Sequence, residues 1–231
     1  MAHSPESSPR QRIVSAITSI LQQGRYIILG TVIAALAVVI LYAIYTEVAT
    51  KRAETATREV EAIQKTYENW STETDASKKA GMEKAIVVQT DVILKKYPRT
   101  YAAQRSLLIR GDLAYANKDW KNAVSFYTRL ADRFPGSYLA VVALTDGAAA
   151  NEQQGDAAGA IALDKRILSY KGLAPEIPSA IFALGRLYEE QSDKKNAQLY
   201  YNKLIDQYPD SGWTKLARDR IIALSLSTEG K

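Results

Sequence analysis

The longest uninterrupted apolar segment runs from Tyr26 to Tyr45 and contains no charged residue, no proline and a single glycine. About 20 residues of helix, at about 1.5 Å each, cross the roughly 30 Å hydrocarbon layer of a bilayer. Tyr26, Tyr42 and Tyr45 lie near its ends, where aromatic side chains favour the membrane interface. A cleaved signal peptide has a shorter apolar core and small residues at its cleavage site, where this chain has Glu47. Residues 26–45 therefore predict an uncleaved transmembrane helix.

Residues 1–25 form a polar, basic tail before this helix. Residues 1–12 contain two prolines and are predicted to be unstructured. Apolar side chains between Ile13 and Leu21 recur at helical spacing. That spacing fits either a short helix on the membrane surface or an extension of the transmembrane helix.

Basic residues on the two sides of the helix predict its orientation. Those before it are Arg10, Arg12 and Arg25, and those that follow are Lys51, Arg52 and Arg58. The numbers are equal, but the downstream residues lie among glutamates, whereas the short tail keeps its positive charge undiluted. We expect a cytoplasmic N-terminus and a C-terminal domain on the outer side of the membrane.

Residues 46–226 show helical periodicity with an internal repeat, followed by a tail at 227–231. Pro98 and Pro135 are 37 residues apart, and Pro135 and Pro209 are 74 apart, which is twice that period. The recurring positions are Gly111, Ala123, Tyr127 and Pro135, then Gly147 and Ala160 in a degenerate middle unit, then Gly185, Tyr188, Ala197, Tyr201 and Pro209. Small residues allow two helices to cross closely, and proline ends a helix.

This pattern resembles the tetratricopeptide repeat (TPR), whose W-x2-L-G-x2-Y, A-x3-F and final P are matched except that Leu107 or Ile181 replaces the tryptophan. The resemblance implies an all-α fold, a TPR-like solenoid of helical hairpins, in which residues 213–226 form a C-terminal capping helix.

Helix boundaries are also predicted from the repeat. Asp119, Asp156 and Asp193 each precede a repeat alanine by four residues, which predicts N-caps of the second helices. The first unit is expected to have helices at about 47–70 and 82–97, joined by a polar loop at 71–81.

Composition excludes several classes of function. The chain of 231 residues has no cysteine and one histidine, His3, so a disulfide, a His-based catalytic triad and a multi-His metal site are all excluded. Its 30 basic and 25 acidic residues are nearly balanced, which gives little support for nucleic-acid binding. We therefore expect a protein that is not an enzyme and needs no cofactor.

The anchor, the polar helix after it and the repeat domain with turns such as Tyr208-Pro209-Asp210-Ser211 together resemble bacterial single-span inner-membrane TPR-like proteins. These are described as ancillary subunits of the SecYEG translocon. The resemblance implies a periplasmic scaffold that binds the translocon or periplasmic chaperones. The repeats are also similar to periplasmic TPR proteins of cell-division coordination and outer-membrane assembly, although the assembly lipoproteins need an N-terminal cysteine. The alternative is therefore an envelope-organising or cell-division-coordinating protein that acts by self-association.

In such a solenoid, the first helix of each unit lines a concave groove. The predicted groove residues are Leu108, Asp112, Tyr115, Leu144, Ala148, Asn151, Phe182, Arg186 and Glu189. Leu108 and Asp112 stand where the chaperone-tail-binding subclass places Lys and Asn, so that carboxylate clamp is absent. A groove with Tyr115 and Phe182 as anchors fits an extended or helical peptide. The alternative is a face that is only solvated, or filled by the degenerate unit.

Overall fold

The computed structural model describes residues 9–172 and 174–229, and every regular element in this part of the chain is an α-helix. The predicted all-α fold is confirmed. Contacts divide the chain into two compact units, Met1–Arg52 and Ala53–Lys231, which are described separately below.

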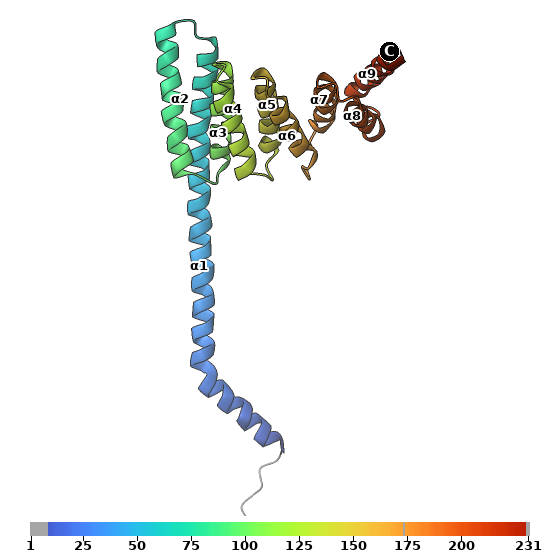
Figure 1. Cartoon of the computed structure of the whole chain (residues 1–231). Helices are drawn as coiled ribbons and strands as arrows, with labels where there is room; N and C mark the ends of the chain where they lie inside the picture. Colours follow the sequence, from blue (N-terminus) through green and yellow to red (C-terminus); the bar gives the residue numbers. More distant parts are fainter. Residues whose placement is uncertain (1–8, 173, 230–231) are drawn as a thin grey trace, which may run out of the picture. The chain divides into compact units, whose positions relative to one another are not determined.

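The first unit contains the N-terminal part of helix α1, which extends from Pro9 to Thr72 (Figure 1). Residues 9–12 are helical, so the prediction that they are unstructured is wrong, while residues 1–8 lie outside the described part. The side chains of the apolar segment are exposed, with 71% exposure at Ile27 and 66% at Leu41. By length and composition, α1 is apolar enough to cross a membrane.

The second unit is a stack of helical hairpins. After the C-terminal part of α1 come α2 (Ala76–Lys96), α3 (Tyr101–Ala116), α4 (Trp120–Arg133), α5 (Tyr138–Gln153), α6 (Ala157–Leu168), α7 (Ile177–Glu190), α8 (Lys194–Gln207) and α9 (Gly212–Glu229). From α2 onward each helix packs against the next one in the chain (Figure 1). The period of the repeat therefore corresponds to one hairpin.

The first hairpin and the C-terminus differ from the prediction. The loop expected at 71–81 is limited to residues 73–75, because α2 already begins at Ala76. Asp75 caps this helix by accepting hydrogen bonds from the backbone amides of Ser77 and Lys78, both at 2.9 Å. At the other end, α9 continues to Glu229, so residues 227–229 are helical rather than a tail.

The turns within the three repeats share one geometry. The predicted N-caps Asp119, Asp156 and Asp193 are confirmed, because each carboxylate accepts a hydrogen bond from the amide three residues later, at 3.3, 2.9 and 3.1 Å. The residue before each aspartate has a positive φ, of 60°, 79° and 61° in chain order. Gly155 is that residue in the middle unit, where it adopts the left-handed conformation without a steric penalty.

The repeat glycines lie where the two helices of a hairpin cross. A Cβ atom added at Gly111 would be 2.4 Å from the ring of Tyr127, and one at Gly185 would be 2.4 Å from the ring of Tyr201. The repeat alanines beside these crossings, Ala123, Ala160 and Ala197, are fully buried. Only residues without bulk therefore allow these helices to approach so closely.

Tyr188 connects neighbouring units. Its hydroxyl accepts a hydrogen bond from Lys165 of α6 at 2.8 Å, and its ring stacks on Tyr200 of α8 at 5.6 Å. Pro135 and Pro209 each follow the end of a second helix by two residues.

Candidate partner-binding groove

Three hollows adjoin along the face built by α3, α5, α7 and α9. The first, of about 340 Å³, lies between α3 and α5; the second, of about 220 Å³, between α5 and α7; and the third, of about 440 Å³, between α7 and α9. Ala149 lines the first two, while Phe182 and Arg186 line the second and third. Because neighbouring hollows share lining residues, they form one surface, which we call the groove.

The first hollow combines aromatic rings with two carboxylates. Tyr67 and Tyr115 line it together with Asp112 and Asp146. Asp112 accepts a hydrogen bond from the buried Tyr127 hydroxyl at 2.9 Å, and burial raises the pKa of Asp112. Burial, followed by the nearby charge of Asp112, raises the pKa of Asp146 to about 6. This end of the groove is therefore acidic and aromatic.

The second hollow contains a charged network around Arg186. Its guanidinium donates to Glu152 at 2.6 Å and to Glu190 at 2.7 Å. Asp164 reaches the hollow from α6, is only 3% exposed, and has no hydrogen-bond partner for its Oδ2 atom among the described residues. Burial, and then the charge of Glu152, raise the pKa of Asp164 to about 7, although Arg186 acts in the opposite direction.

The third hollow lies against the last helix. Glu189 accepts hydrogen bonds from the Tyr201 hydroxyl at 2.9 Å and from the Arg220 guanidinium of α9. Phe182 packs against Tyr201 and against Trp213, with ring centroids 5.6 and 5.2 Å apart. The ion pair and these rings fix the side chains that separate the second hollow from the third.

Comparison with known proteins agrees with this architecture. A family model of the tetratricopeptide repeat matches residues 105–137, which cover most of α3 with α4, and residues 179–211, which cover most of α7 with α8. The chain carries tetratricopeptide repeats. The unmatched α5–α6 hairpin between them is the degenerate middle unit. Repeats of this kind generally form non-enzymatic scaffolds that bind other proteins.

A relative with a similar sequence is a TPR repeat-containing protein of Treponema pallidum (strain Nichols). It is 30% identical over 115 residues, which cover 50% of this chain. The aligned part is 48% of that protein, so this chain spans about half the length of the curated relative it matches.

Six of the nine predicted groove residues line the hollows of the TPR domain. They are Asp112, Tyr115, Ala148, Phe182, Arg186 and Glu189. Leu108, Leu144 and Asn151 are instead 5%, 6% and 3% exposed. The two leucines belong to the main hydrophobic core, and Asn151 accepts a hydrogen bond from Gln154 at 2.8 Å. These three side chains line none of the three hollows of the groove.

Other residues line the groove without having been predicted from the sequence. Among them are Tyr67, Asp146, Asp164, Trp213 and Arg220. Tyr67 and the two α9 residues lie outside the matched repeats, so no repeat position points to them. Asp164, in contrast, occupies the fourth position after Ala160, where the flanking repeats have tyrosine. This replacement of tyrosine by aspartate is visible in the sequence.

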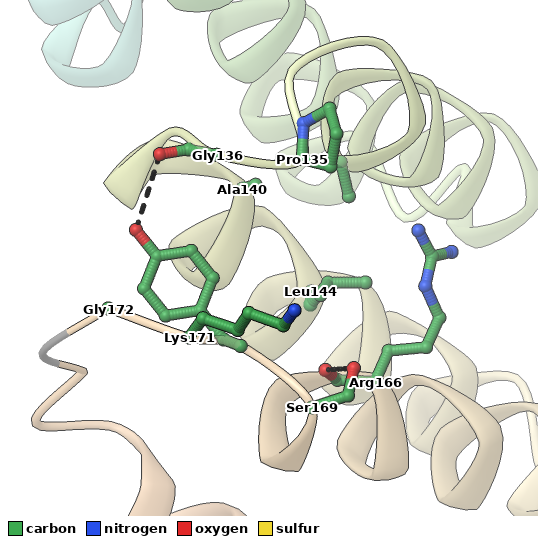
Figure 2. Close-up of a pocket in the computed structure, with 10 residues that line it drawn as sticks. Pro135, Gly136, Ala140, Leu144, Arg166, Ser169, Lys171 and Gly172 are labelled. Carbon is green, nitrogen blue, oxygen red and sulfur yellow. Dashed lines mark hydrogen bonds between the residues drawn. The ribbon is translucent and has the colours of Figure 1, made fainter.

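A larger hollow of about 540 Å³ lies between the loops that follow α4 and α6 (Figure 2). Several of its polar groups are engaged within the fold: Arg166 donates to Asp132 at 2.5 Å, and the Ser169 hydroxyl donates to the Arg166 carbonyl at 2.7 Å. The Tyr170 hydroxyl donates to the Gly136 carbonyl across the hollow at 3.4 Å. The groove, with its unpartnered carboxylate, is therefore the better candidate for a ligand.

Proposed function

We propose that this protein is a membrane-anchored, non-catalytic scaffold whose groove binds a segment of a partner protein. The observation that carries the proposal is the series of three adjoining hollows over the first helices of the repeats. Tyr115 and Phe182 supply aromatic surface, and the acidic side chains between them supply polar contacts. An extended or helical peptide is the ligand that such a groove fits best.

Anchoring by residues 26–45 is the second part of the proposal. Their exposed apolar side chains would be covered by lipid, and an anchored adaptor has a high effective concentration beside membrane-bound partners. The domain would face the periplasm, with the N-terminus in the cytoplasm. Protease treatment of spheroplasts tests this orientation: digestion of the repeat domain in intact spheroplasts supports it, whereas protection until the inner membrane is broken contradicts it.

We propose the secretion translocon and periplasmic chaperones as partners, on the basis of the resemblance between the whole chain and ancillary translocon subunits. Photo-crosslinking from Tyr115 or Phe182 in cells should capture these subunits, while the same probe at Val88 of α2, which is 54% exposed and outside the groove, should not. The double variant Tyr115→Ala/Phe182→Ala should release the partner. Retention of every partner by that variant would reject the groove as the binding surface.

Self-association is the alternative function, and helix α9 supports it. Leu216, Ile222 and Leu226 are 46%, 58% and 64% exposed on this terminal helix, although an outer helix is usually polar. An envelope-organising or cell-division-coordinating protein would use this surface between copies. Light scattering of the full chain in detergent should then show an oligomer that Ile222→Ser/Leu226→Ser dissociates. A monomeric wild-type protein would exclude this alternative.

A further inference from the structure

The middle repeat differs from its neighbours at one position of the groove. Counted from the N-cap aspartate of its helix, Asp164 occupies the position held by Tyr127 and Tyr201 in the flanking repeats. Both tyrosines are buried, and their hydroxyls donate to Asp112 and Glu189 at 2.9 Å. In each flanking repeat an acidic side chain thus accepts a hydrogen bond from a donor within the fold.

In the middle repeat, no described residue provides a corresponding donor to Asp164 Oδ2. Leu163 takes the place over Gly147, 3.0 Å from where a Cβ atom would lie, so the ring that is missing at 164 is not needed to fill the crossing. The Asp164 carboxylate lines the second hollow instead, 3% exposed and with Oδ2 unpartnered. Buried polar atoms in native proteins almost always have a hydrogen-bond partner, and one that lacks it needs a specific explanation. A donor that arrives with a ligand provides that explanation.

The charges around the hollow favour a cationic donor. Arg186 is the one basic residue among the described residues that line it, and its guanidinium already donates to Glu152 and Glu190. Asp164 therefore has no ion-pair partner among the described residues, and Asp146 adds a further acidic group in the adjoining hollow. A ligand with a positive charge would balance this excess.

The walls of the hollow define the shape of that cation. Phe182 and Trp213 form one side, and Ala148, Ala149 and Ala183 contribute further apolar surface. Long aliphatic stems pack on such surfaces while their charged end reaches a polar partner. A tyrosine from a partner would bring a donor without charge, and an arginine would place a second guanidinium beside Arg186. The compact ammonium of lysine fits both the shape and the charge.

We propose that the second hollow receives a lysine side chain from a partner segment bound in the groove, with its ammonium donating to Asp164 Oδ2. The methylene stem lies against Phe182 and Trp213. This inference rests on the proposed function, since it names the side chain that the groove selects. The middle repeat is degenerate because it has exchanged an internal tyrosine for a contact with the ligand.

The test compares short peptides with randomised flanks and a fixed central lysine, norleucine or glutamate, titrated onto the full chain in detergent. Binding is followed by the anisotropy of a label on the peptide. A hydrogen bond to a charged group predicts that wild type binds the lysine pool at least about 10-fold more tightly than the norleucine pool. Asp164→Asn, which keeps the shape but not the charge, should reduce that preference to less than about 3-fold.

Two further variants sharpen the test. Asp164→Ala removes the carboxylate without adding bulk beside Leu163, so it should fold and no longer distinguish lysine from norleucine. Asp146→Asn, in the adjoining hollow, is the matched control and should keep the preference for lysine. The circular dichroism spectrum of each variant shows whether it has retained its helices.

Three results would overturn the inference: equal binding of the lysine and norleucine pools, no binding of any pool, or a lysine preference that survives in Asp164→Asn. The same holds if Asp146→Asn alone removes the preference. Each of these is distinct from failure of the proposed function, because crosslinking from Tyr115 and Phe182 would still capture a partner if the groove binds without a lysine.

Discussion

Gly185 lies beneath the ring of Tyr201, a fully buried side chain whose hydroxyl donates to Glu189 at 2.9 Å. A methyl group at Gly185 would be 2.4 Å from this ring, and the ring cannot move away without breaking that hydrogen bond. We expect Gly185→Ala to lower the free energy of unfolding by about 1–3 kcal/mol, as other overpacked cores do.

Thermal unfolding followed by circular dichroism measures this effect, and Gly81→Ala is the matched control. Gly81 lies inside α2, and apart from its chain neighbours and its own helix backbone no described atom lies within 4 Å of an added Cβ, so alanine there should stabilise the protein, by about 0.5–1 kcal/mol. Equal changes at the two positions would show that contact with the tyrosine ring is not the cause.

Asp164 gives a second prediction at the residue scale, on the dependence of stability on pH. Burial raises its pKa to about 7 in the folded protein, so the folded state holds this proton at pH values where the unfolded chain, with a pKa of about 3.9, has lost it. The stability that this group contributes is present below the pKa of the unfolded chain and is lost as the pH rises towards about 7.

Asp164→Asn removes this titration. Between pH 5 and pH 8 the melting temperature of this variant should therefore rise relative to that of wild type, as measured by scanning calorimetry. The difference between the two proteins isolates Asp164, because the other buried acids, Asp112 and Asp146, titrate in both. Parallel melting temperatures across this range would show that Asp164 is not held in its protonated form.

At the scale of the helix, the caps are the most regular feature of the repeats. Asp156 caps α6, which has 12 residues, and accepts a hydrogen bond from the Gly159 amide at 2.9 Å. Asp156→Ala should lower the free energy of unfolding by about 1 kcal/mol, whereas Asp156→Asn, which can still accept this bond, should retain most of the stability. Hydrogen exchange of the α6 amides measures both, and equal loss of protection in the two variants would contradict the role of the cap.

The repeat elements were predictable because their signals are local. A cap aspartate, a crossing glycine and a terminating proline each act within one hairpin, and the helices α3 to α8 follow them. The loop before α2 was overestimated because residues 71–81 contain no large apolar side chain, and an exposed helix can have the same composition as a loop. Asp75, the cap of α2, was the signal that marks the true boundary.

The groove was less predictable, because exposure depends on neighbouring helices rather than on position within a repeat. Leu108, Leu144 and Phe182 each precede a repeat glycine by three residues. The two leucines are buried in the main core, whereas Phe182 lies beside Trp213 of α9 and remains partly open. Periodicity places a residue on a helix face, but the side chains of the next unit decide whether that face meets solvent.

At the scale of the whole molecule, the two units differ in hydropathy. The exposed apolar side chains of residues 26–45 are not covered by the described residues of their own unit, and lipid would cover them. In the repeat domain the covering surface is the neighbouring hairpin, so the end of the stack is its weakest point.

Helix α9 supplies that covering surface for the last repeat, and its removal tests how far stability is shared along the stack. Ile181 and Tyr201, both fully buried, belong to a cluster that α9 completes. In solenoids each unit is stabilised mainly by its neighbours, so deletion of residues 212–229 should increase hydrogen exchange in α7 and α8 first and leave α3 and α4 protected. Ile222→Ser/Leu226→Ser, which changes only exposed side chains of α9, is the control and should leave α7 and α8 protected. Equal deprotection of α3 to α8 in the deletion variant would instead mean that the domain unfolds as one cooperative unit, with α9 required for all of it.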